Sequence, residues 1–333
     1  MKILILGGTS FFGREFAIQA HKAGHEVTVF SRRCPTNGLP LDIKQVRGDR
    51  SVHVDIIRMS VDFWDVIIDN ICYSPKDAES AVKAFDGRVG QYIFTSSEFV
   101  YSALDGASSP YRERHTEIFK ENSSLRENED YQYAFNKLDA ENIFLSAFKE
   151  KKFPISIIRF PVVIGPNDPT LRAFSYWVRL SDGKPLLLPG AIFSRRYIYS
   201  KDAARAFETL ISAKNTEGET YNFGDNQTIN LDDFIKLSAN IMTKKADIIY
   251  PEFDWLKENS FNFESSPFTT LTDFNLDISK VQKAFDWKST DINIWLKETI
   301  NWFFFKYTGS LPKNYALRKE ELLLAEKLTN KSI

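Results

Sequence analysis

The chain has 333 residues, of which 43% are hydrophobic and 26% are charged, and its formal net charge is -1. These values are ordinary for a globular protein and argue against intrinsic disorder. Because the balance of charge is almost neutral, no global field attracts the chain to nucleic acid or to anionic lipid, and we expect neither as a partner.

The cysteines and the apolar runs argue against two further classes of protein. Cys34 and Cys72 are the only cysteines, and their spacing fits neither a zinc site nor a redox pair, so we expect no metal. The apolar run before Gly7 is too short for a signal peptide, and no stretch approaches the roughly 18 apolar residues that span a bilayer. We therefore expect a cytoplasmic protein without a membrane segment.

Strand and helix patterns alternate along the first half of the chain. Strands are expected at 2–6, 27–30, 64–69, 91–95 and 155–160. Helices are expected at 12–23, 77–85 and 133–149. This alternation predicts an α/β fold, a doubly wound parallel sheet of the Rossmann type with helices on both faces.

The alternation breaks after Gly165-Pro166, which suggests a second, interleaved lobe. We predict a dinucleotide-binding domain over 1–166, to which a helix at 200–212 and a strand at 220–223, both within 200–224, return. A smaller substrate-binding lobe would comprise 167–199 and 225–312. The tail, 313–333, has an amphipathic helical pattern that would suit a surface or subunit contact, and a homodimer is possible.

A glycine-containing loop follows the first predicted strand and opens the first predicted helix: Gly7, Gly8, Thr9, Ser10, Phe11, Phe12 and Gly13. Backbone N–H groups at such a helix N-terminus bind the pyrophosphate of a dinucleotide. Gly7 permits a tight turn and Gly13 permits close packing of helix on sheet, whereas Ser10 replaces the middle glycine of the usual pattern. The loop predicts an NAD or NADP site, and a glycine turn without a ligand is the alternative.

The end of the second predicted strand bears on the choice between NAD and NADP. NAD enzymes usually present an acid there, but this chain has Ser31 and Arg32. Arg32 could pair with a 2′-phosphate and Ser31 could hydrogen-bond it, which favours NADP, although a solvated arginine is common at a strand end. Asp49, after the next strand, could lie near the adenine amino group or could only close a turn.

Tyr133 and Lys137 are four residues apart in a predicted helix, so they share one face. This helix follows the strand that ends at Ser97, and the carboxyl edge of a parallel sheet is where substrates bind. A lysine ammonium favours the phenolate form of a nearby tyrosine, which can then exchange a proton. Ser97 would hydrogen-bond the substrate oxygen while hydride passes to or from the cofactor, and an ordinary surface pair is the alternative.

The chain resembles the extended short-chain dehydrogenases/reductases, the NAD(P)-dependent sugar epimerase and dehydratase group. The resemblance covers nearly the whole chain and is carried by the glycine loop, by Tyr133 with Lys137, and by the segments 96–101, 159–166 and 195–202. It implies that Ser97, Tyr133 and Lys137 are catalytic and that Lys137 also holds the nicotinamide ribose. It further implies that Arg195 grips a nucleotide-sugar diphosphate, for which a strand-edge salt bridge is the alternative.

Two departures from the family pattern narrow the expected reaction. Val162 stands where sugar-nucleotide enzymes often have asparagine, which weakens the case for a nucleotide diphosphate. Dehydratases place two acids after the active-site hydroxyl residue, but here Phe99 follows Glu98, which could be an acid or base or only a solvated or salt-bridged carboxylate. We therefore expect an NAD(P)-dependent epimerase that acts on a sugar or nucleotide-sugar carbinol through a transient keto intermediate. An NADPH-dependent ketoreductase or a dehydratase is the alternative.

The glycine loop is also similar to that of an atypical branch of the family, the chloroplast stem-loop RNA-binding proteins. Basic residues near aromatic ones could form a phosphate groove beside a vestigial cofactor site: Arg112, Arg114, Arg195, Arg196 and Tyr197. The neutral overall charge and the intact set of Tyr133, Lys137 and Ser97 favour the enzyme.

Overall fold

The computed structural model describes residues 1–33 and 38–330, which separate into two compact units. The first unit comprises Met1–Val163, Ile198–Asn226 and Leu276–Ser289, and the second comprises Ile164–Tyr197, Gln227–Asn275 and Thr290–Ile333. Each unit is therefore assembled from three separate stretches of chain. Cys34 lies outside the described residues, and Cys72 is a buried free thiol.

A seven-stranded sheet forms the centre of the first unit, with the strand order β10-β6-β5-β4-β1-β2-β3. Every pairing in it is parallel. The strands are β1 (Lys2–Leu6), β2 (Glu26–Ser31), β3 (Lys44–Arg47), β4 (Trp64–Asp69), β5 (Val89–Ser97), β6 (Ile155–Phe160) and β10 (Glu219–Asn222). β1 lies between β2 and β4, so the chain reverses its direction of growth there and opens a crevice at the carboxyl ends of these strands.

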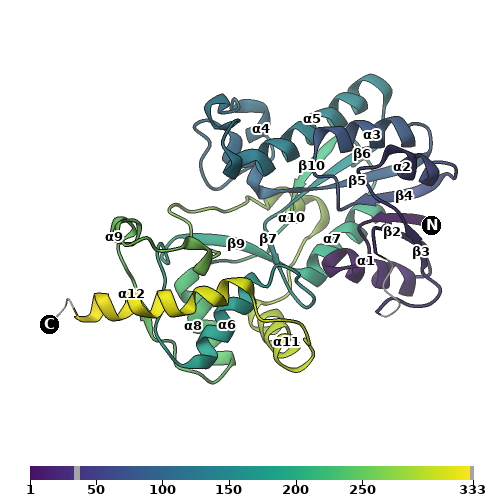
Figure 1. Cartoon of the computed structure of the whole chain (residues 1–333). Coiled ribbons are helices and arrows are strands. Elements are labelled where there is room, and N and C mark those ends of the chain that lie inside the picture. The colour runs from purple at the N-terminus through teal and green to yellow at the C-terminus, as the bar shows by residue number, and fades with distance from the viewer. Residues whose placement is uncertain (34–37, 331–333) are drawn as a thin grey trace. The chain divides into compact units, whose positions relative to one another are not determined.

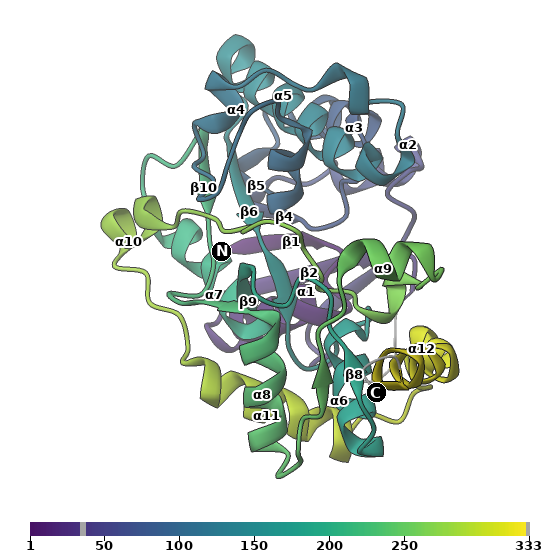
Figure 2. The same ribbon diagram turned by 90° about the vertical axis from the view of Figure 1, so that its left-hand side faces the viewer.

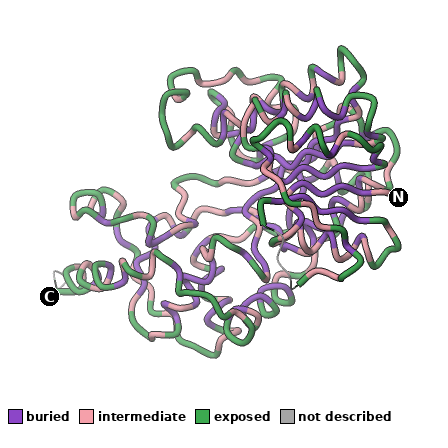
Figure 3. Tube along the Cα trace, turned by 45° about the vertical axis from the view of Figure 1, so that its right-hand side comes forward, coloured by how far each residue is buried: buried purple, intermediate pink, exposed green. Residues whose placement is uncertain are grey.

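Helices cover both faces of this sheet, with α2, α3 and α5 on one side and α1 and α7 on the other (Figure 1). The helices of the unit are α1 (Phe11–Lys22), α2 (His53–Met59), α3 (Pro75–Phe85), α4 (His115–Ile118), α5 (Gln132–Lys151), α7 (Ser200–Ser212) and α10 (Ser279–Phe285). Because both faces are covered, the inner strands β1, β2, β4, β5 and β6 are largely buried, as Figure 3 shows, whereas the edge strand β3 is not. The doubly wound α/β fold expected from the sequence is confirmed.

The core between the sheet and α3 and α5 is rich in aromatic rings. The Tyr92 ring lies 5.3 Å from Phe144 and 5.4 Å from Phe153, measured between centroids, and all three side chains are buried. The start of α3 is fixed by a capping box in which the Ser74 hydroxyl accepts from the Asp77 backbone and the Asp77 carboxylate accepts from the Ser74 backbone. These contacts set the position of the loop that follows β4.

Two smaller sheets, of order β11-β9-β7 and β12-β8, lie outside the seven-stranded sheet, and β8, β11, β12 and most of β9 belong to the second unit. Their strands are β7 (Val162–Ile164), β8 (Leu186–Leu187), β9 (Ser194–Tyr199), β11 (Thr228–Asn230) and β12 (Ile248–Ile249). The helices are α6 (Arg172–Asp182), α8 (Leu231–Ile241), α9 (Phe253–Glu258), α11 (Ile292–Phe305) and α12 (Arg318–Asn330). Within residues 1–33 and 38–330, no helix combines the length and the hydrophobicity needed to cross a bilayer.

The C-terminal helix α12 lies beside β8 and α9 (Figure 2). Its Ala325 joins an apolar cluster with Leu187 and Leu256. On the same helix the buried Glu321 carboxylate accepts two hydrogen bonds of 3.2 Å from Arg179 of α6. The helix that the sequence pattern suggests for the tail is therefore anchored by one face inside the second unit.

Candidate active site

The loop between β1 and α1 has close backbone contacts that only glycine allows. Gly7 has a φ of +86°, and a Cβ atom there would lie 2.6 Å from Cγ2 of Ile71. A Cβ atom on Gly13 would lie 2.4 Å from the backbone oxygen of Gly7. Both distances are too short for real contacts, so the two glycines allow the loop to fold tightly over the first turn of α1.

The N-terminus of α1 is open to a ligand. Ser10 is its N-cap in an extended conformation, and in the described part of the chain the Ser10 hydroxyl makes no capping hydrogen bond. The first N–H groups of a helix have no partner within the helix, so those of α1 can bind an anion. Thr9, Phe11 and Phe12 flank these groups, and the Phe12 ring packs 5.8 Å from the Phe160 ring.

Asn70 adds a buried donor beside this loop, and the sequence analysis missed it. Its Nδ2 atom lies 3.0 Å from the position that a Cβ atom on Gly13 would occupy. Its Oδ1 atom accepts a 2.7 Å hydrogen bond from Thr95 Oγ1, whereas Nδ2 has no hydrogen-bond partner among the described residues. An amide donor and an open helix terminus together fit the phosphate oxygens of a dinucleotide. The sequence did carry a signal for Asn70, because it is a polar residue directly after the buried strand β4.

A buried ion pair fixes the end of β4, from which Asn70 projects. The Asp69 carboxylate accepts a 3.0 Å hydrogen bond from Arg50 and a 2.6 Å hydrogen bond from the Tyr92 hydroxyl. Asp69 is fully buried and Arg50 almost so. Burial, together with the Asp69 charge, raises the pKa of Tyr92 well above its usual range.

The residues proposed to select the cofactor lie together at the ends of β2 and β3. Thr9 Oγ1 donates a 3.2 Å hydrogen bond to Ser31 Oγ, and the Ser31 hydroxyl donates to the Arg33 carbonyl. Asp49 accepts hydrogen bonds from the Ser51 hydroxyl and backbone at 2.7 Å and 2.9 Å. These bonds, with a smaller contribution from the Arg32 charge, lower the pKa of Asp49. Asp49 thus closes a turn and also lies within electrostatic range of the exposed Arg32.

Lys137 is buried at the carboxyl edge of the sheet. Its Nζ atom donates to the carbonyl oxygens of Cys72 and Thr95 at 2.7 Å and 2.8 Å, and the side chain is 2% exposed. This burial lowers the pKa of Lys137. Tyr133, one turn earlier on α5, is 44% exposed, and its ring centroid lies 5.9 Å from Lys137 Nζ. The phenol is therefore accessible to a ligand while the ammonium is enclosed.

Ser97 is the last residue of β5, and its hydroxyl accepts a 3.3 Å hydrogen bond from the Phe99 backbone. The Phe99 ring packs edge-to-face on the Tyr133 ring at 6.2 Å, so the end of β5 and the start of α5 meet at one edge. Glu98 is fully buried rather than solvated. After burial itself, the Glu98 charge is the second factor that raises the pKa of Tyr111.

Arg195, expected at the substrate, lies on β9 in the second unit, whereas the other predicted site residues lie in the first. Arg195 pairs with Ile229 of β11 and is 7% exposed. Its guanidinium carbon lies 5.5 Å from the Phe274 ring centroid. The guanidinium thus packs against an aromatic face within its own unit.

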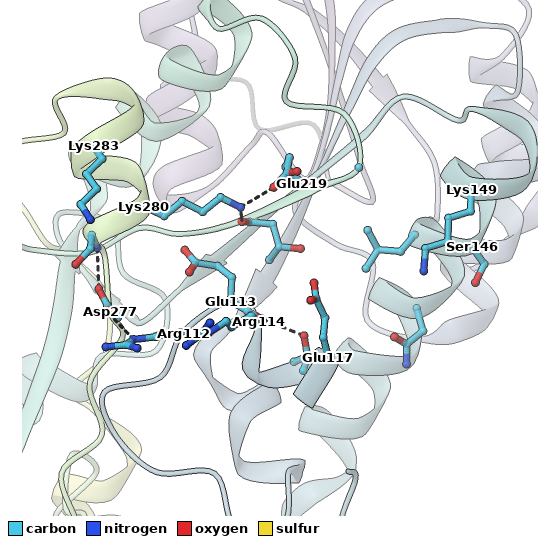
Figure 4. Close-up of a pocket in the computed structure, with 16 residues that line it drawn as sticks. Arg112, Glu113, Arg114, Glu117, Ser146, Lys149, Glu219, Asp277, Lys280 and Lys283 are labelled. Atoms are coloured by element: carbon cyan, nitrogen blue, oxygen red, sulfur yellow. Dashed lines mark hydrogen bonds and ion pairs between the residues drawn. The ribbon is translucent and has the colours of Figure 1, made fainter. Parts of the chain in front are cut away.

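The first unit also contains a cavity of about 990 Å³, which Figure 4 shows at the edge strand β10. None of the residues predicted for catalysis, cofactor or substrate binding lines it, whereas Arg112 and Arg114 of the alternative phosphate groove do. Two ion pairs lie along the cavity, with Arg112 3.0 Å from Asp277 and Lys280 2.7 Å from Glu219. Lys280 also donates to the Thr220 carbonyl of β10, so this charged cluster covers part of the exposed sheet edge.

Comparison with known proteins identifies the family. A family model described as the NAD dependent epimerase/dehydratase family matches residues 3–224. The chloroplast stem-loop binding protein of 41 kDa b from Arabidopsis thaliana is 25% identical over 98% of this chain and 85% of its own length. The human dTDP-D-glucose 4,6-dehydratase is 28% identical over 43% of this chain and 38% of its own length.

Solved structures show the same fold. The UDP-glucuronic acid 4-epimerase from Bacillus cereus in complex with NAD has a TM-score of 0.73 at 19% identity, covering 93% of this chain and 99% of the other. The dTDP-glucose 4,6-dehydratase from Bacillus anthracis in complex with NAD has a TM-score of 0.71 at 18% identity, covering 92% and 97%. Because the family model spans more than half of the sequence, this chain belongs to the NAD dependent epimerase/dehydratase family.

Proposed function

We propose that the protein is an NAD(P)-dependent epimerase that acts on a sugar or nucleotide-sugar carbinol through a transient keto intermediate. The observation that carries this proposal is the position of Tyr133, Lys137 and Ser97 at one edge of the sheet. Lys137 donates to the Thr95 carbonyl two residues before Ser97, and the Phe99 ring contacts Tyr133. A phenol, an ammonium and a hydroxyl in this arrangement suit proton exchange with a substrate alcohol.

In the proposed reaction, Tyr133 as phenolate would accept the proton of the substrate hydroxyl, and the hydride of the carbon would pass to a bound dinucleotide. Ser97 would hold the substrate oxygen by a hydrogen bond, and the Lys137 ammonium would stabilise the phenolate charge. Return of hydride to the opposite face of the carbonyl, with the proton returned from Tyr133, would invert the carbon centre. Glu98 would be a further acid or base near the sugar, and Arg195 a ligand of the nucleotide diphosphate.

A dinucleotide bound along the loop after β1 would supply the hydride acceptor and donor. Gly7, Gly13 and the N-terminus of α1 would hold its pyrophosphate, with Asn70 as an additional donor. Lys137 would hold the nicotinamide ribose, and Asp49 would approach the adenine.

We further propose a preference for NADP over NAD, which is supported by Ser31 and the exposed Arg32 at the end of β2. Arg32→Ala would weaken NADPH binding by about tenfold, the loss of one exposed charge-assisted contact, while NADH binding changes little. Fluorescence titration with both cofactors measures this ratio, with Arg33→Ala as the adjacent control. Equal losses for NADH and NADPH would contradict the assignment of the 2′-phosphate to Arg32.

The first experiment on the reaction is to denature freshly purified protein and identify any released dinucleotide by mass spectrometry. An epimerase regenerates its oxidised cofactor in each cycle, so retained NAD or NADP in the oxidised form supports the proposal. An empty site that binds added NADPH would instead favour a ketoreductase.

Tyr133→Phe tests the proton transfer directly. With a confirmed substrate, it should lower kcat by about 10²- to 10⁴-fold, the usual contribution of a positioned acid or base, while cofactor binding persists. Tyr131→Phe removes a neighbouring hydroxyl outside the catalytic set and is the matched control. Unchanged turnover in Tyr133→Phe would show that the proton follows another route.

RNA binding is a second candidate function, and one observation favours it. The Arabidopsis stem-loop binding protein aligns with 98% of this chain, whereas the human dehydratase aligns with 43%. Fewer residues are available to bind RNA phosphates than the sequence suggested. Arg195 and Tyr197 are buried, and Arg112 pairs with Asp277. Arg114, Lys149 and Lys283 still line the cavity at β10.

Fluorescence anisotropy with a labelled RNA stem-loop tests this candidate. Binding through phosphates would weaken steeply between 50 mM and 200 mM salt and would fall further in Arg114→Ala. A protein that retains oxidised dinucleotide and shows no salt-dependent RNA binding is the enzyme alone.

A further inference from the structure

The Lys137 ammonium lies within a shell of aromatic rings and carbonyl oxygens. Its Nζ atom is 4.8 Å from the Phe94 ring centroid, 5.0 Å from that of Tyr73 and 5.9 Å from that of Tyr133. Two carbonyl oxygens, of Cys72 and Thr95, accept its hydrogen bonds. An ammonium has three N–H donors, so these two bonds leave one donor for a ligand.

Most buried lysines are stabilised by an ion pair, whereas rings and carbonyl oxygens surround the Lys137 ammonium. Among the residues that the structure describes, no carboxylate lies within ion-pair distance of Lys137 Nζ. The titratable groups that act on it electrostatically are the Cys72 thiol and the carboxyl groups of Asp69, Glu141 and Asp77. Burial disfavours the charged form, whereas ring faces and carbonyl dipoles attract a cation. The rings thus help to keep the ammonium charged where water does not reach it.

Tyr73 is the ring in this shell that neither the core nor the proposed reaction explains. Phe94 is fully buried in the sheet, and Tyr133 is the proposed acid and base. Tyr73, by contrast, is 53% exposed. Its backbone N–H donates to Asp77 Oδ2 at 3.0 Å, within the turn that caps α3. The cap therefore fixes the backbone of residue 73 while its side chain extends to Lys137.

We propose that Tyr73 is a positioning residue whose ring faces the Lys137 ammonium and holds it against the Cys72 and Thr95 carbonyls. The ring carries this role, and the hydroxyl does not. The inference rests on the proposed function of Lys137, because an ammonium held in this way keeps both its charge and the direction of its remaining N–H donor. Charge and direction are what a neighbouring phenolate and a cofactor ribose would need.

The test compares Tyr73→Phe, which keeps the ring, with Tyr73→Leu, which removes it. The protonation of Lys137 is followed by the ¹³Cε chemical shift in protein with labelled lysines, and the resonance is assigned by its absence in Lys137→Met. Tyr73→Leu should lower the titration midpoint of Lys137 by about one pKa unit, since a desolvated cation–π contact contributes about 1–2 kcal/mol. Tyr73→Phe should titrate like the wild type. Tyr73→Met replaces Leu if that variant does not fold.

Two results would overturn the proposal. Equal shifts in Tyr73→Phe and Tyr73→Leu would assign the effect to the hydroxyl, and no shift in either would remove the ring from the environment of Lys137. Tyr250→Leu, which removes a tyrosine of similar exposure (52%) in the second unit, controls for the general loss of an exposed ring. The Lys137 titration does not measure turnover, so the two proposals can fail separately. If the epimerase proposal were wrong, Tyr133→Phe would stay active, but Tyr73→Leu would still lower the Lys137 pKa.

Discussion

The buried charge of Lys137 has a consequence for stability that does not depend on any substrate. Burial lowers the pKa of Lys137 from its usual 10.5 in the folded protein, whereas the unfolded chain keeps the usual value. Between these two pKa values the unfolded state binds more protons, so raising the pH favours the folded state. The protonated form of Lys137 therefore opposes folding, and this cost is relieved as the pH rises from the lowered pKa toward 10.5.

We predict that the free energy of unfolding of the wild type rises relative to that of Lys137→Met as the pH increases from about 7 to about 10.5. The difference should be about 1.4 kcal/mol for each unit by which the Lys137 pKa is lowered. Urea denaturation at a series of pH values measures it. Lys149→Met removes an exposed lysine from the same helix and should run parallel to the wild type. A flat difference for Lys137→Met would mean that the site solvates the ammonium as well as water does.

Individual residues show which parts of the site could be predicted from the sequence and which could not. The four-residue spacing of Tyr133 and Lys137 is visible in the sequence because it lies within one helix. Asn70 and Tyr73 meet the glycine loop and Lys137 only because β4 is placed beside β1 and β5 in the sheet. Strand order is a property of the whole sheet, and no local pattern encodes it. The burial of Arg195 could not be predicted from the sequence for the same reason, since it depends on the pairing of β9 with β11.

At the scale of elements, the alternating patterns predicted most strands and helices of the parallel sheet, but not α2. The expected strand at 64–69 and the expected helix at 200–212 have the bounds of β4 and α7. These elements are continuous apolar runs or strongly amphipathic helices, so local sequence determines them. The small strands β8 and β12 have only two residues each and carry no such pattern, because tertiary contacts form them.

The C-terminal helix α12 depends on a buried ion-pair cluster. Glu321 accepts from Arg179 at 3.2 Å, from Arg318 at 2.8 Å and from the Leu187 backbone at 3.0 Å. Glu321→Gln would leave the buried Arg179 guanidinium without its carboxylate, whereas Arg318 keeps Asp182 at 2.9 Å, and we predict a destabilisation of about 3–5 kcal/mol in the second unit. Chemical denaturation measures this loss. Glu320→Gln, at an exposed neighbouring position, should stay within about 0.5 kcal/mol of the wild type, and similar values for the two variants would refute the role of the cluster.

At the scale of the whole molecule, the two units are interleaved along the chain. The segment Leu276–Ser289 belongs to the first unit, although the chain on both sides of it belongs to the second. It covers the edge strand β10, where Lys280 donates to Thr220 and the Phe285 ring lies 5.3 Å from Tyr221. Trp287 closes the segment, with its indole N–H donating to the Gly224 carbonyl at 2.9 Å. The first unit therefore needs residues as far along the chain as Ser289.

This interleaving predicts that two neighbouring tryptophans stabilise different units. Trp287 and Trp295 are eight residues apart in the sequence and are 5% and 0% exposed, but Trp287 packs in the first unit and Trp295 in the second. Each substitution by alanine should cost about 3–5 kcal/mol, the usual loss for a buried tryptophan. Hydrogen–deuterium exchange locates that loss. Trp287→Ala should increase exchange in β10 and β6, and Trp295→Ala should increase it in α8 and α6. If both variants loosened the same elements, the division into two units would not describe how this chain unfolds, because local stability follows packing rather than proximity in sequence.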